Sequence, residues 1–214
     1  MDTILGLLAQ KAPNLDEITR ERVSTFRDLV VLENENQNLT RLLTPDDFYE
    51  GHVLDVLELL KVENLKFPAL DLGSGAGVPG LLSALIQPQK WILSESEKSK
   101  AGFLKRTVDS LALSEFVTVF SGRGEEYLKN RNVNSVVIRA VASLTKIFSW
   151  IGNCSTWNNL ILLKGPAWEK EWAEFCQNQP CIPLRIVEKR EYCTGKEKKQ
   201  RIILCLERVP RGTF

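Results

Sequence analysis

Residues 69–80 of this 214-residue chain read ALDLGSGAGVPG, which combines a short apolar run with four closely spaced glycines. The run ends in an acid, Asp71, and Pro79 precedes the last glycine. Glycine permits a positive φ and lets a ligand approach the backbone, and proline suits the first turn of a helix. The stretch therefore predicts a buried strand, a tight turn and a helix start. Because the first amides of a helix lack partners within it, we expect a cofactor-sized ligand above this turn.

The chain after residue 65 alternates between strand-like and helix-like segments. Strands are expected at 69–72, 90–94, 116–121, 135–138 and 159–164, with helices beginning near residues 79, 97, 124, 143 and 168. This alternation predicts a parallel sheet with right-handed crossovers. The runs 183–192 and 200–208 are joined by a loop too short for a helix, so they predict an antiparallel hairpin at the end of the sheet. The expected fold is α/β and Rossmann-like, with a mostly parallel seven-stranded sheet.

The chain before residue 65 is predicted to be helical. We divide it into an N-terminal helical arm, 1–64, packed on a core domain, 65–214. Asn14 and Glu17 resemble a capping box, and an apolar stripe follows at Ile18, Val23, Phe26, Leu29 and Val30. Residues 33–40, ENENQNLT, are too polar for a buried helix and predict a loop. Thr44 and Pro45 begin a second helix expected to reach about Lys61.

Composition excludes several classes of protein. There is no apolar run of about 18 residues and no N-terminal basic lead with a cleavage site, so we expect a cytoplasmic protein without a membrane partner. Five cysteines without a CxxC pair, and one histidine, argue against a zinc site and a disulfide framework. A formal charge of +1 provides no general attraction to nucleic acid, which requires a local basic patch instead.

The glycine loop fits two cofactors. Gly75, Gly77 and Gly80 satisfy GxGxxG, the dinucleotide fingerprint. S-adenosylmethionine (SAM) is favoured because a carboxylate at Asp71 opposes a pyrophosphate but can orient groups near a cationic sulfonium. The terminal hairpin also fits poorly with a second nucleotide-binding half. Asp71 has an alternative role, which is to tie down the turn through backbone amides.

Acids after the next two strands have two readings each. Glu95 ends the second strand about 20 residues beyond the loop, where it can bind a cofactor ribose or cap the helix that begins near Glu97. Glu125 and Glu126 follow the third strand and either contact the adenine or serve as first-turn acids.

The fourth strand, within VVIRAVASL, delivers Arg139 to the edge of the sheet that carries the glycine loop. Buried arginines are normally paired, and a pair with Asp71 or another acid would keep Arg139 in the site. Methylation of an exocyclic amine usually goes with an Asn/Asp-Pro-Pro-aromatic loop at this point, and C5 methylation needs a cysteine nucleophile. Neither stands here. A ring nitrogen with a free lone pair needs neither, so alignment and a desolvated pocket would suffice for catalysis.

These motifs resemble the RsmG family, also called glucose-inhibited division protein B, of bacterial methyltransferases. The resemblance covers nearly the whole chain and rests on QNLT (37–40), HVLD (52–55), DLGSGAGVPG (71–80), GRGEEY (122–127), RAVASL (139–144), LLKG (162–165) and KEKKQR (196–201). It implies the Rossmann-like fold of a class I SAM-dependent methyltransferase, and transfer of a methyl group from SAM to N7 of guanine 527 in 16S rRNA. The reaction would be an in-line displacement without a general base, by a monomer acting on 16S rRNA, the small ribosomal subunit or its assembly intermediate.

The resemblance implies that Gly73, Val78, Gly124, Glu125 and Arg139 contact SAM, with Arg139 as the catalytic residue. Together with the residue-based reasoning, the expected cofactor-binding set is Asp71, Gly73, Gly75, Gly77, Val78, Glu95, Gly124, Glu125 and Arg139. Arg139→Ala is expected to weaken SAM binding or turnover and to leave the fold intact.

RNA binding requires phosphate neutralisation. The candidates are Lys164 at a strand end and Lys196, Lys198, Lys199 and Arg201 in the hairpin loop, although such a loop is also typical of a solvated turn. His52 is included, but we expect it to pack or anchor a helix rather than act as a base. Trp168 and Trp172 are expected in the core, unless one is exposed and stacks on a flipped guanine.

Overall fold

The computed structural model describes residues 3–178, 184–195 and 197–209, and these form a seven-stranded sheet with strand order β3-β2-β1-β4-β5-β7-β6. Its strands are β1 (Ala69–Leu72), β2 (Trp91–Glu95), β3 (Val117–Ser121), β4 (Ser135–Arg139), β5 (Asn159–Lys164), β6 (Leu184–Thr194) and β7 (Lys199–Arg208). Strands β1 to β5 run parallel, whereas β7 is antiparallel to both β5 and β6. The predicted sheet and terminal hairpin are confirmed.

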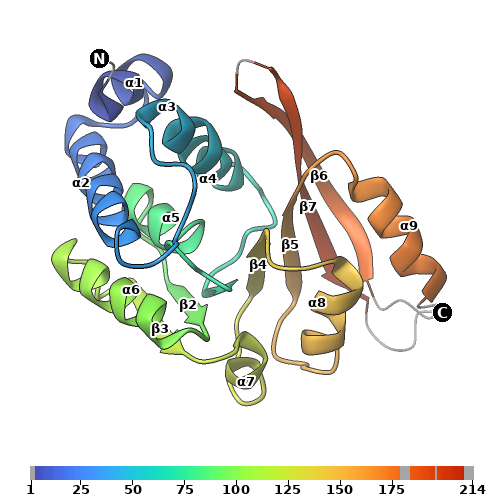
Figure 1. The fold of residues 1–214 in the computed structure, drawn as a ribbon. Helices are drawn as coiled ribbons and strands as arrows, with labels where there is room; N and C mark the ends of the chain where they lie inside the picture. The colour runs from blue at the N-terminus through green and yellow to red at the C-terminus, as the bar shows by residue number, and fades with distance from the viewer. Residues whose placement is uncertain (1–2, 179–183, 196, 210–214) are drawn as a thin grey trace.

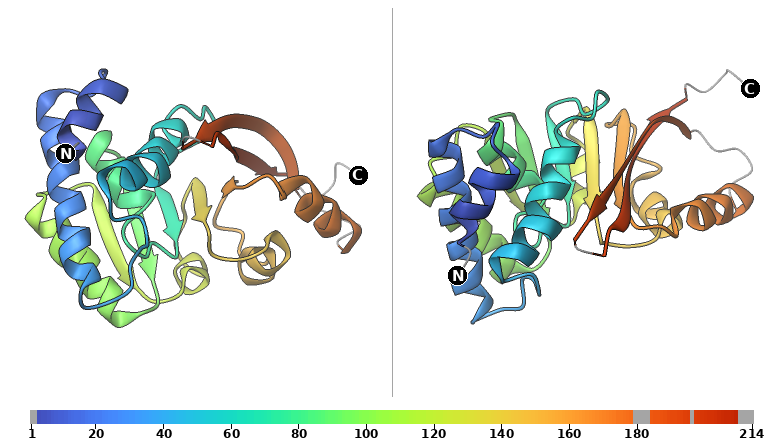
Figure 2. Two further views of the ribbon diagram at one scale, coloured as in Figure 1. Left: turned by 45° about the horizontal axis from the view of Figure 1, so that its top comes forward. Right: turned by 90° about the horizontal axis from the view of Figure 1, so that it is seen from above.

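Helices cover both faces of the sheet (Figures 1 and 2). The arm packs with α5 (Gly80–Ile86) and α6 (Lys98–Ser110) on one face, and α7 (Gly124–Leu128), α8 (Leu144–Ile151) and α9 (Trp168–Asn178) lie on the other. Alternate strand residues serve the two cores: Ala69 faces the arm side, and Leu70 faces the α7–α9 side. The sheet is thus buried from both sides, as expected for parallel strands.

The arm consists of α1 (Ile4–Lys11), α2 (Glu17–Asn34), α3 (Pro45–Phe48), the π-helical turn η1 (Tyr49–Val53) and α4 (Leu54–Leu59). Thr44 caps α3, as predicted: its hydroxyl accepts a hydrogen bond from the Asp47 amide at 3.1 Å. The loop predicted after α2 is also confirmed. The three helical pieces from Pro45 to Leu59 follow without a break, which agrees with the single helix that was predicted there.

Two expectations for α2 were wrong. Its N-cap is Asp16 rather than Asn14, because the Asp16 carboxylate accepts the Thr19 amide at 2.6 Å. Ile18 lies on the solvent side with 70% of its surface exposed, whereas Val23 and Phe26 are fully buried. Ile18 lies five residues before Val23, which is about 140° around the helix, so it falls outside the stripe formed by Val23, Phe26 and Val30.

Two further observations bear on composition. Within the described ranges, no helix is both long and apolar enough to cross a bilayer. Cys154, Cys176, Cys193 and Cys205 are free thiols, and Cys181 lies outside the described residues.

A substitution at Gly80 tests how tightly α5 packs on the sheet. A Cβ atom there would lie 2.6 Å from Leu93 Cδ2 and 2.8 Å from Asp71 Cβ, so we expect Gly80→Ala to lower the free energy of unfolding by about 1–3 kcal/mol through overpacking. In Gly102→Ala, inside α6, the added Cβ would meet only Arg106 Nη1 at 3.5 Å, and we expect a gain of up to about 1 kcal/mol. Urea denaturation measures both, and equal effects would contradict the packing described here.

Candidate active site

The glycine loop joins β1 to α5 beside β4, where the strand order of the sheet reverses. Gly73, Gly75 and Gly77 have φ values of +81°, +52° and +90°, which explains the glycines. Gly73 is exposed and Gly75 half-buried, whereas Gly77 and Val78 are buried. The surface open to a ligand is therefore formed by residues 73–75, and residues 77–78 support it from beneath.

Asp71 is 1% exposed, and its Oδ2 accepts a hydrogen bond from the Gly80 amide at 2.8 Å. Burial raises the pKa of this carboxyl to about 7. The amide of Gly80, the first residue of α5, is therefore bonded to Asp71 and is not available to a ligand. The side chain ties the glycine turn down, which was the alternative reading.

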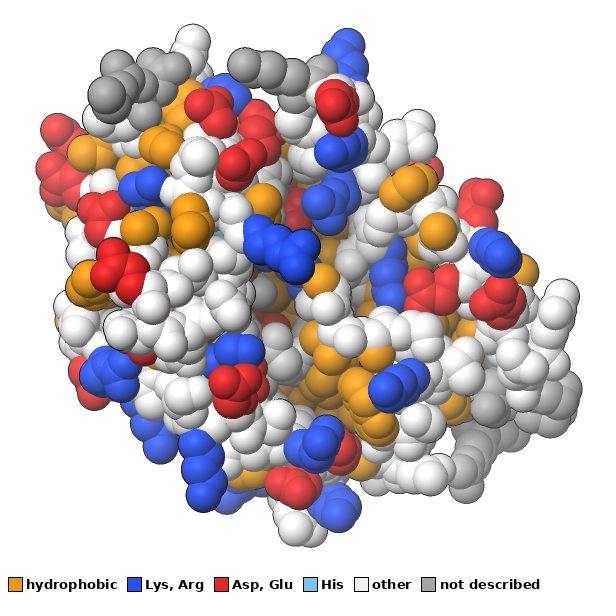
Figure 3. Space-filling view, viewed as in Figure 1, with side chains coloured by type: hydrophobic (Ala, Val, Ile, Leu, Met, Phe, Trp, Pro, Cys, Tyr) orange, Lys and Arg blue, Asp and Glu red, His pale blue; other side chains and the backbone are white. Residues whose placement is uncertain are grey.

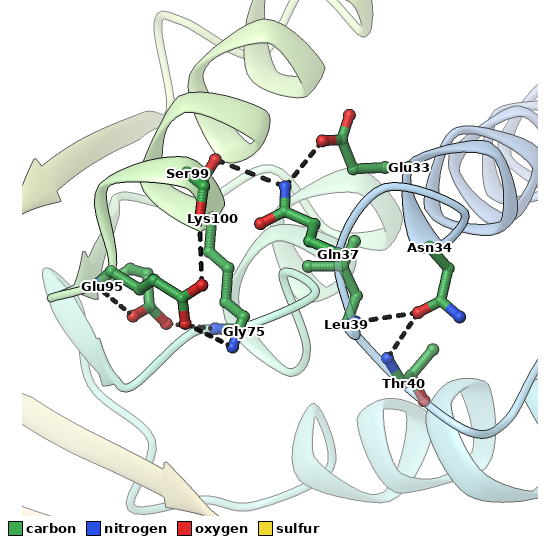
Figure 4. A network of polar contacts seen from close by, with 10 residues as sticks. Glu33, Asn34, Gln37, Leu39, Thr40, Gly75, Glu95, Ser99 and Lys100 are labelled. Atoms are coloured by element: carbon green, nitrogen blue, oxygen red, sulfur yellow. Dashed lines mark hydrogen bonds and ion pairs between the residues drawn. The ribbon is translucent and has the colours of Figure 1, made fainter.

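Both carboxylate oxygens of Glu95 accept hydrogen bonds from backbone amides. Oε2 accepts the Gly75 amide at 3.0 Å, and Oε1 accepts the Glu97 amide at 2.8 Å, just before α6. Figure 4 shows Glu95 beside Gly75, with Lys100 nearby. Lys100 pairs with Glu97 at 2.8 Å. Glu95 therefore holds Glu97, the residue that precedes α6, and fixes the position of the ligand-facing Gly75.

The polar loop after α2 lies beside α6, where Gln37 reaches the Ser99 carbonyl (Figure 4). Gln37 Nε2 donates to Glu33 Oε1 at 2.7 Å and to the Ser99 carbonyl at 3.5 Å. Asn34 Oδ1 accepts the amides of Leu39 and Thr40 at 2.8 and 3.0 Å. The QNLT segment is thus ordered by the arm, a location that the sequence reasoning did not assign.

Arg139 ends β4, but its side chain turns toward the arm and is 13% exposed. Nε pairs with Asp55 Oδ2 at 3.1 Å, Nη1 lies 2.9 Å from His52 Nδ1, and Nη2 donates to the Gly51 carbonyl at 2.6 Å. Arg139 is paired with an acid, as expected for a buried arginine, and that acid is Asp55 of the arm. Sequence reasoning assigned Asp55 no role, although an acid among the buried residues of an apolar helix was an available signal.

The network around Arg139 extends in two directions. Asp55 Oδ1 accepts a hydrogen bond from the Tyr192 hydroxyl at 2.8 Å, which connects the network to strand β6 of the hairpin. On the other side, His52 Nε2 lies 3.0 Å from Thr40 Oγ1 in the loop after α2. Burial, and then the charge of Arg139, lower the pKa of His52 to about 3, so the ring is neutral at neutral pH. Burial raises the pKa of Asp55, and Arg139 opposes this shift.

The loop after β4, residues 139–144, lies against the glycine loop and is bonded at both ends. A Cβ on Gly73 would lie 2.9 Å from Val141 Cγ2. At the far end, the Leu144 amide donates to Glu171 of α9. Lys164 Nζ donates to the Ala142 carbonyl at 3.1 Å and pairs with Glu171 at 2.8 Å. Lys164, an expected RNA contact, thus braces this loop.

The remaining candidates lie around the same edge. A Cβ on Gly124 would meet Leu72 Cγ at 3.0 Å, so Gly124 adjoins the end of β1, and Glu125 beside it is half-buried. Lys198 and Lys199 are exposed on the hairpin and Arg201 is half-buried, whereas Lys196 lies outside the described residues. Figure 3 shows a hollow in the middle of this face, with basic side chains over the hairpin. In the described part of the chain, no three potential metal ligands are grouped.

Comparison with known proteins shows which family this chain belongs to. The sequence matches the family described as rRNA small subunit methyltransferase G over residues 19–203. The chain belongs to this family. A ribosomal RNA small subunit methyltransferase G from Rhodopirellula baltica is 35% identical over 169 residues, 78% of this chain and 72% of the relative. Another of that name, from Thermotoga neapolitana, is 32% identical over 216 residues, 99% of this chain and 93% of the relative.

Solved structures share the fold at low sequence identity. The human methyltransferase 10 domain containing protein has a TM-score of 0.55 at 15% identity, with 86% of this chain and 96% of that chain covered. The N-terminal domain of human METTL16 in complex with S-adenosylhomocysteine (SAH) has 0.53 at 14%, covering 86% and 82%. TrmK of M. capricolum, in complex with its natural cofactor product SAH, has 0.51 at 14%, covering 65% and 61%.

The fold is therefore that of the Rossmann-like class I methyltransferases, as predicted. SAM is the cofactor of this methyltransferase family, as the sequence also predicted. The exposed Gly73 and half-buried Gly75, held at positive φ and without side chains, fit a cofactor lying against the backbone.

The Arg139 network changes the expectation for Arg139→Ala. The substitution leaves the buried Asp55 carboxylate without its cation, so we expect a loss of about 3–5 kcal/mol in the free energy of unfolding rather than an intact fold. Arg185→Ala is the matched control, because its pair with Glu207 is largely exposed and contributes about 0–1 kcal/mol. Chemical denaturation compares the two, and equal losses would refute a supporting role for Arg139.

His52 predicts a pH dependence of stability. Its pKa falls from an ordinary 6.5 to about 3 on folding, so the unfolded chain binds the extra proton between those values and stability declines as the pH is lowered. We expect the stability of His52→Gln to change less steeply, by up to about 1.4 kcal/mol per pH unit. The raised pKa of Asp71 has the opposite effect, because it lowers the stability of the fold as the pH rises from 3.8 to about 7. This contribution is the same in the wild type and in His52→Gln. Parallel stability curves would contradict a buried neutral ring.

Proposed function

We propose that this protein transfers the methyl group of SAM to N7 of a guanine in 16S rRNA, guanine 527 by resemblance to the family. The observation that carries the proposal is the meeting of the glycine loop and the loop after β4 at one edge of a methyltransferase sheet, in a chain of the small-subunit rRNA family. The substrate is 16S rRNA, the small subunit or its assembly intermediate. We also propose that the enzyme acts as a cytoplasmic monomer.

The chemistry proposed is an in-line displacement without a general base. Guanine N7 carries a lone pair and no proton, so attack on the methyl group requires no proton transfer. His52, the one histidine of the chain, is buried and neutral with both ring nitrogens near partners. Burial raises the pKa of the Cys154 thiol near Glu125, which disfavours a thiolate nucleophile. These groups suit a reaction that proceeds by alignment and desolvation.

We assign the cofactor contacts to residues at the carboxyl ends of the strands. SAM supplies the electrophilic methyl group, and Gly73 and Gly75 present the backbone against which it is held. Gly77, Val78 and Asp71 keep that loop in shape from beneath. On the remaining sides, Glu95 is assigned to the ribose, and Gly124 and Glu125 to the adenine.

Arg139 is proposed to position the loop that follows it rather than to touch the reacting atoms, because all three of its nitrogens face the arm. The cation–carboxylate pair fixes the start of residues 139–144, and Glu171 fixes their end. Rigid support of this kind keeps donor and acceptor aligned.

On the RNA side, we propose that Lys196, Lys198, Lys199 and Arg201 neutralise phosphates from the hairpin. Lys199 pairs with Glu197, but both side chains are more than 70% exposed, so a phosphate can replace the carboxylate at little cost. His52 and Lys164 support RNA binding indirectly, through the segments that they brace.

Two measurements test the proposed function. Calorimetry should show SAM binding, and a titration without heat at high micromolar SAM would leave a non-catalytic RNA-binding protein. Labelled SAM is then offered with small subunits, naked rRNA and total protein in parallel. We expect label in 16S rRNA, whereas label confined to protein or a small molecule would overturn the RNA substrate.

Replacing Lys198 and Lys199 by alanine should weaken RNA binding and reduce the slope of its salt dependence by the equivalent of about two phosphate contacts, without a change in SAM affinity.

A further inference from the structure

A pocket of about 290 Å³ lies between the start of α9 and the β6–β7 hairpin. Its walls include Gly165, Trp168, Glu169, Glu191, Tyr192 and Arg201. The residues that line it are aromatic, acidic and basic, and its volume is near the lower end of those found for small-ligand sites. Tyr192 and Arg201 have roles assigned above, but none of those roles places a ligand in the pocket.

The pocket opens where the acceptor of the methyl group must arrive. Lys164, the last residue of β5, is paired with Ile202 of β7, and Arg139 is paired with Leu163. Gly165 therefore continues past the carboxyl end of β5, next to the strand that ends in Arg139. Strand β5 lies two strand spacings from β1, about 10 Å, so the pocket and the glycine loop share one edge of the sheet.

The pocket wall is also connected to the Arg139 network. Tyr192 lines the pocket and donates its hydroxyl to Asp55, the partner of Arg139. Trp168 is half-buried, and Lys189 Nζ lies 4.7 Å from the centroid of its ring. An indole ring held in this way is a rigid surface on which a base can stack.

Glu191 is the unusual member of this set. It lies on β6, on a face proposed to bind a polyanion, and among the described residues its carboxylate has no hydrogen bond or ion pair. A carboxylate facing RNA is unfavourable unless it accepts hydrogen bonds from a base. Glu169 differs, because it lies in the first turn of α9, where an acid favours the helix dipole.

We propose that this pocket receives the target guanine, with Trp168 stacking on the ring and the Glu191 carboxylate accepting its N1–H and N2 amino hydrogens. This inference rests on the proposed function. An ionised carboxylate only accepts hydrogen bonds, and guanine is the standard base with two adjacent donors on its Watson–Crick edge. Reading that edge in a pocket leaves N7, on the opposite side of the purine, free to face the methyl donor. Arg201 at the same wall binds the flanking phosphate.

The test compares guanosine with inosine, which lacks the N2 amino group, at the target position of reconstituted small subunits. For the wild-type enzyme we expect kcat/KM to fall about 10- to 100-fold on inosine, as for loss of a hydrogen bond to a charged group. Glu191→Gln should be weaker on guanosine and should lose most of this discrimination. The matched control is Glu174→Gln, on the exposed side of α9, which should keep the wild-type ratio.

Trp168→Ala should raise KM by roughly 10- to 100-fold, with much of the loss restored in Trp168→Phe, as expected for stacking. Calorimetry with SAM should give wild-type affinity for all five variants, Glu169→Gln included, which shows that they are folded and that the donor site is intact.

The outcomes separate this inference from the proposed function. If the wild type methylates guanosine but Glu191→Gln discriminates as strongly as the wild type, the pocket assignment is overturned and the proposed function stands. A discrimination lost in Glu169→Gln instead would overturn the role of Glu191. If the wild type methylates no guanosine in the subunit, both proposals fail.

Discussion

The buried pair between Arg139 and Asp55 is the contact on which the rest of this site depends. Desolvating two charges is unfavourable, and a buried pair persists only where further hydrogen bonds satisfy both partners. Here the Gly51 carbonyl and the His52 ring bond the remaining nitrogens of the Arg139 guanidinium. The Tyr192 hydroxyl bonds the second oxygen of the Asp55 carboxylate. One interaction thus joins the arm, the fourth strand and the terminal hairpin, which are far apart in the sequence.

This constraint explains why the arm and the sheet work as one unit. The loop after β4 is held at its start by the arm and at its end by α9, and its middle lies against the glycine loop. A methyltransferase that uses no general base depends on the relative position of donor and acceptor. The proposed guanine pocket shares Tyr192 with the same network, so the acceptor side and the donor side are positioned by common contacts.

The sheet could be predicted from the sequence because parallel strands and crossover helices leave local periodic patterns. Two alternative roles were predicted for each of Asp71 and Glu95. Both carboxylates bond the backbone of neighbouring turns, and the contact of Glu95 with the ribose stays a proposal. The partner of Arg139 could not be predicted as Asp55, since the sequence contains no distance between residues 55 and 139. The start of α2 was misplaced because Asn14 and Asp16 are both good N-caps, and only the tertiary structure selects between them.

The identity of the methylated nucleoside tests the central claim most directly. Small subunits that lack the modification are incubated with the enzyme and SAM, and their 16S rRNA is digested to nucleosides and analysed by mass spectrometry against methylguanosine standards. The account predicts 7-methylguanosine, formed from a single guanine of each subunit. Methylation of an exocyclic amine, of a ring carbon or of the ribose would contradict it, because none of those acceptor atoms is the proton-free ring nitrogen on which the proposed mechanism rests.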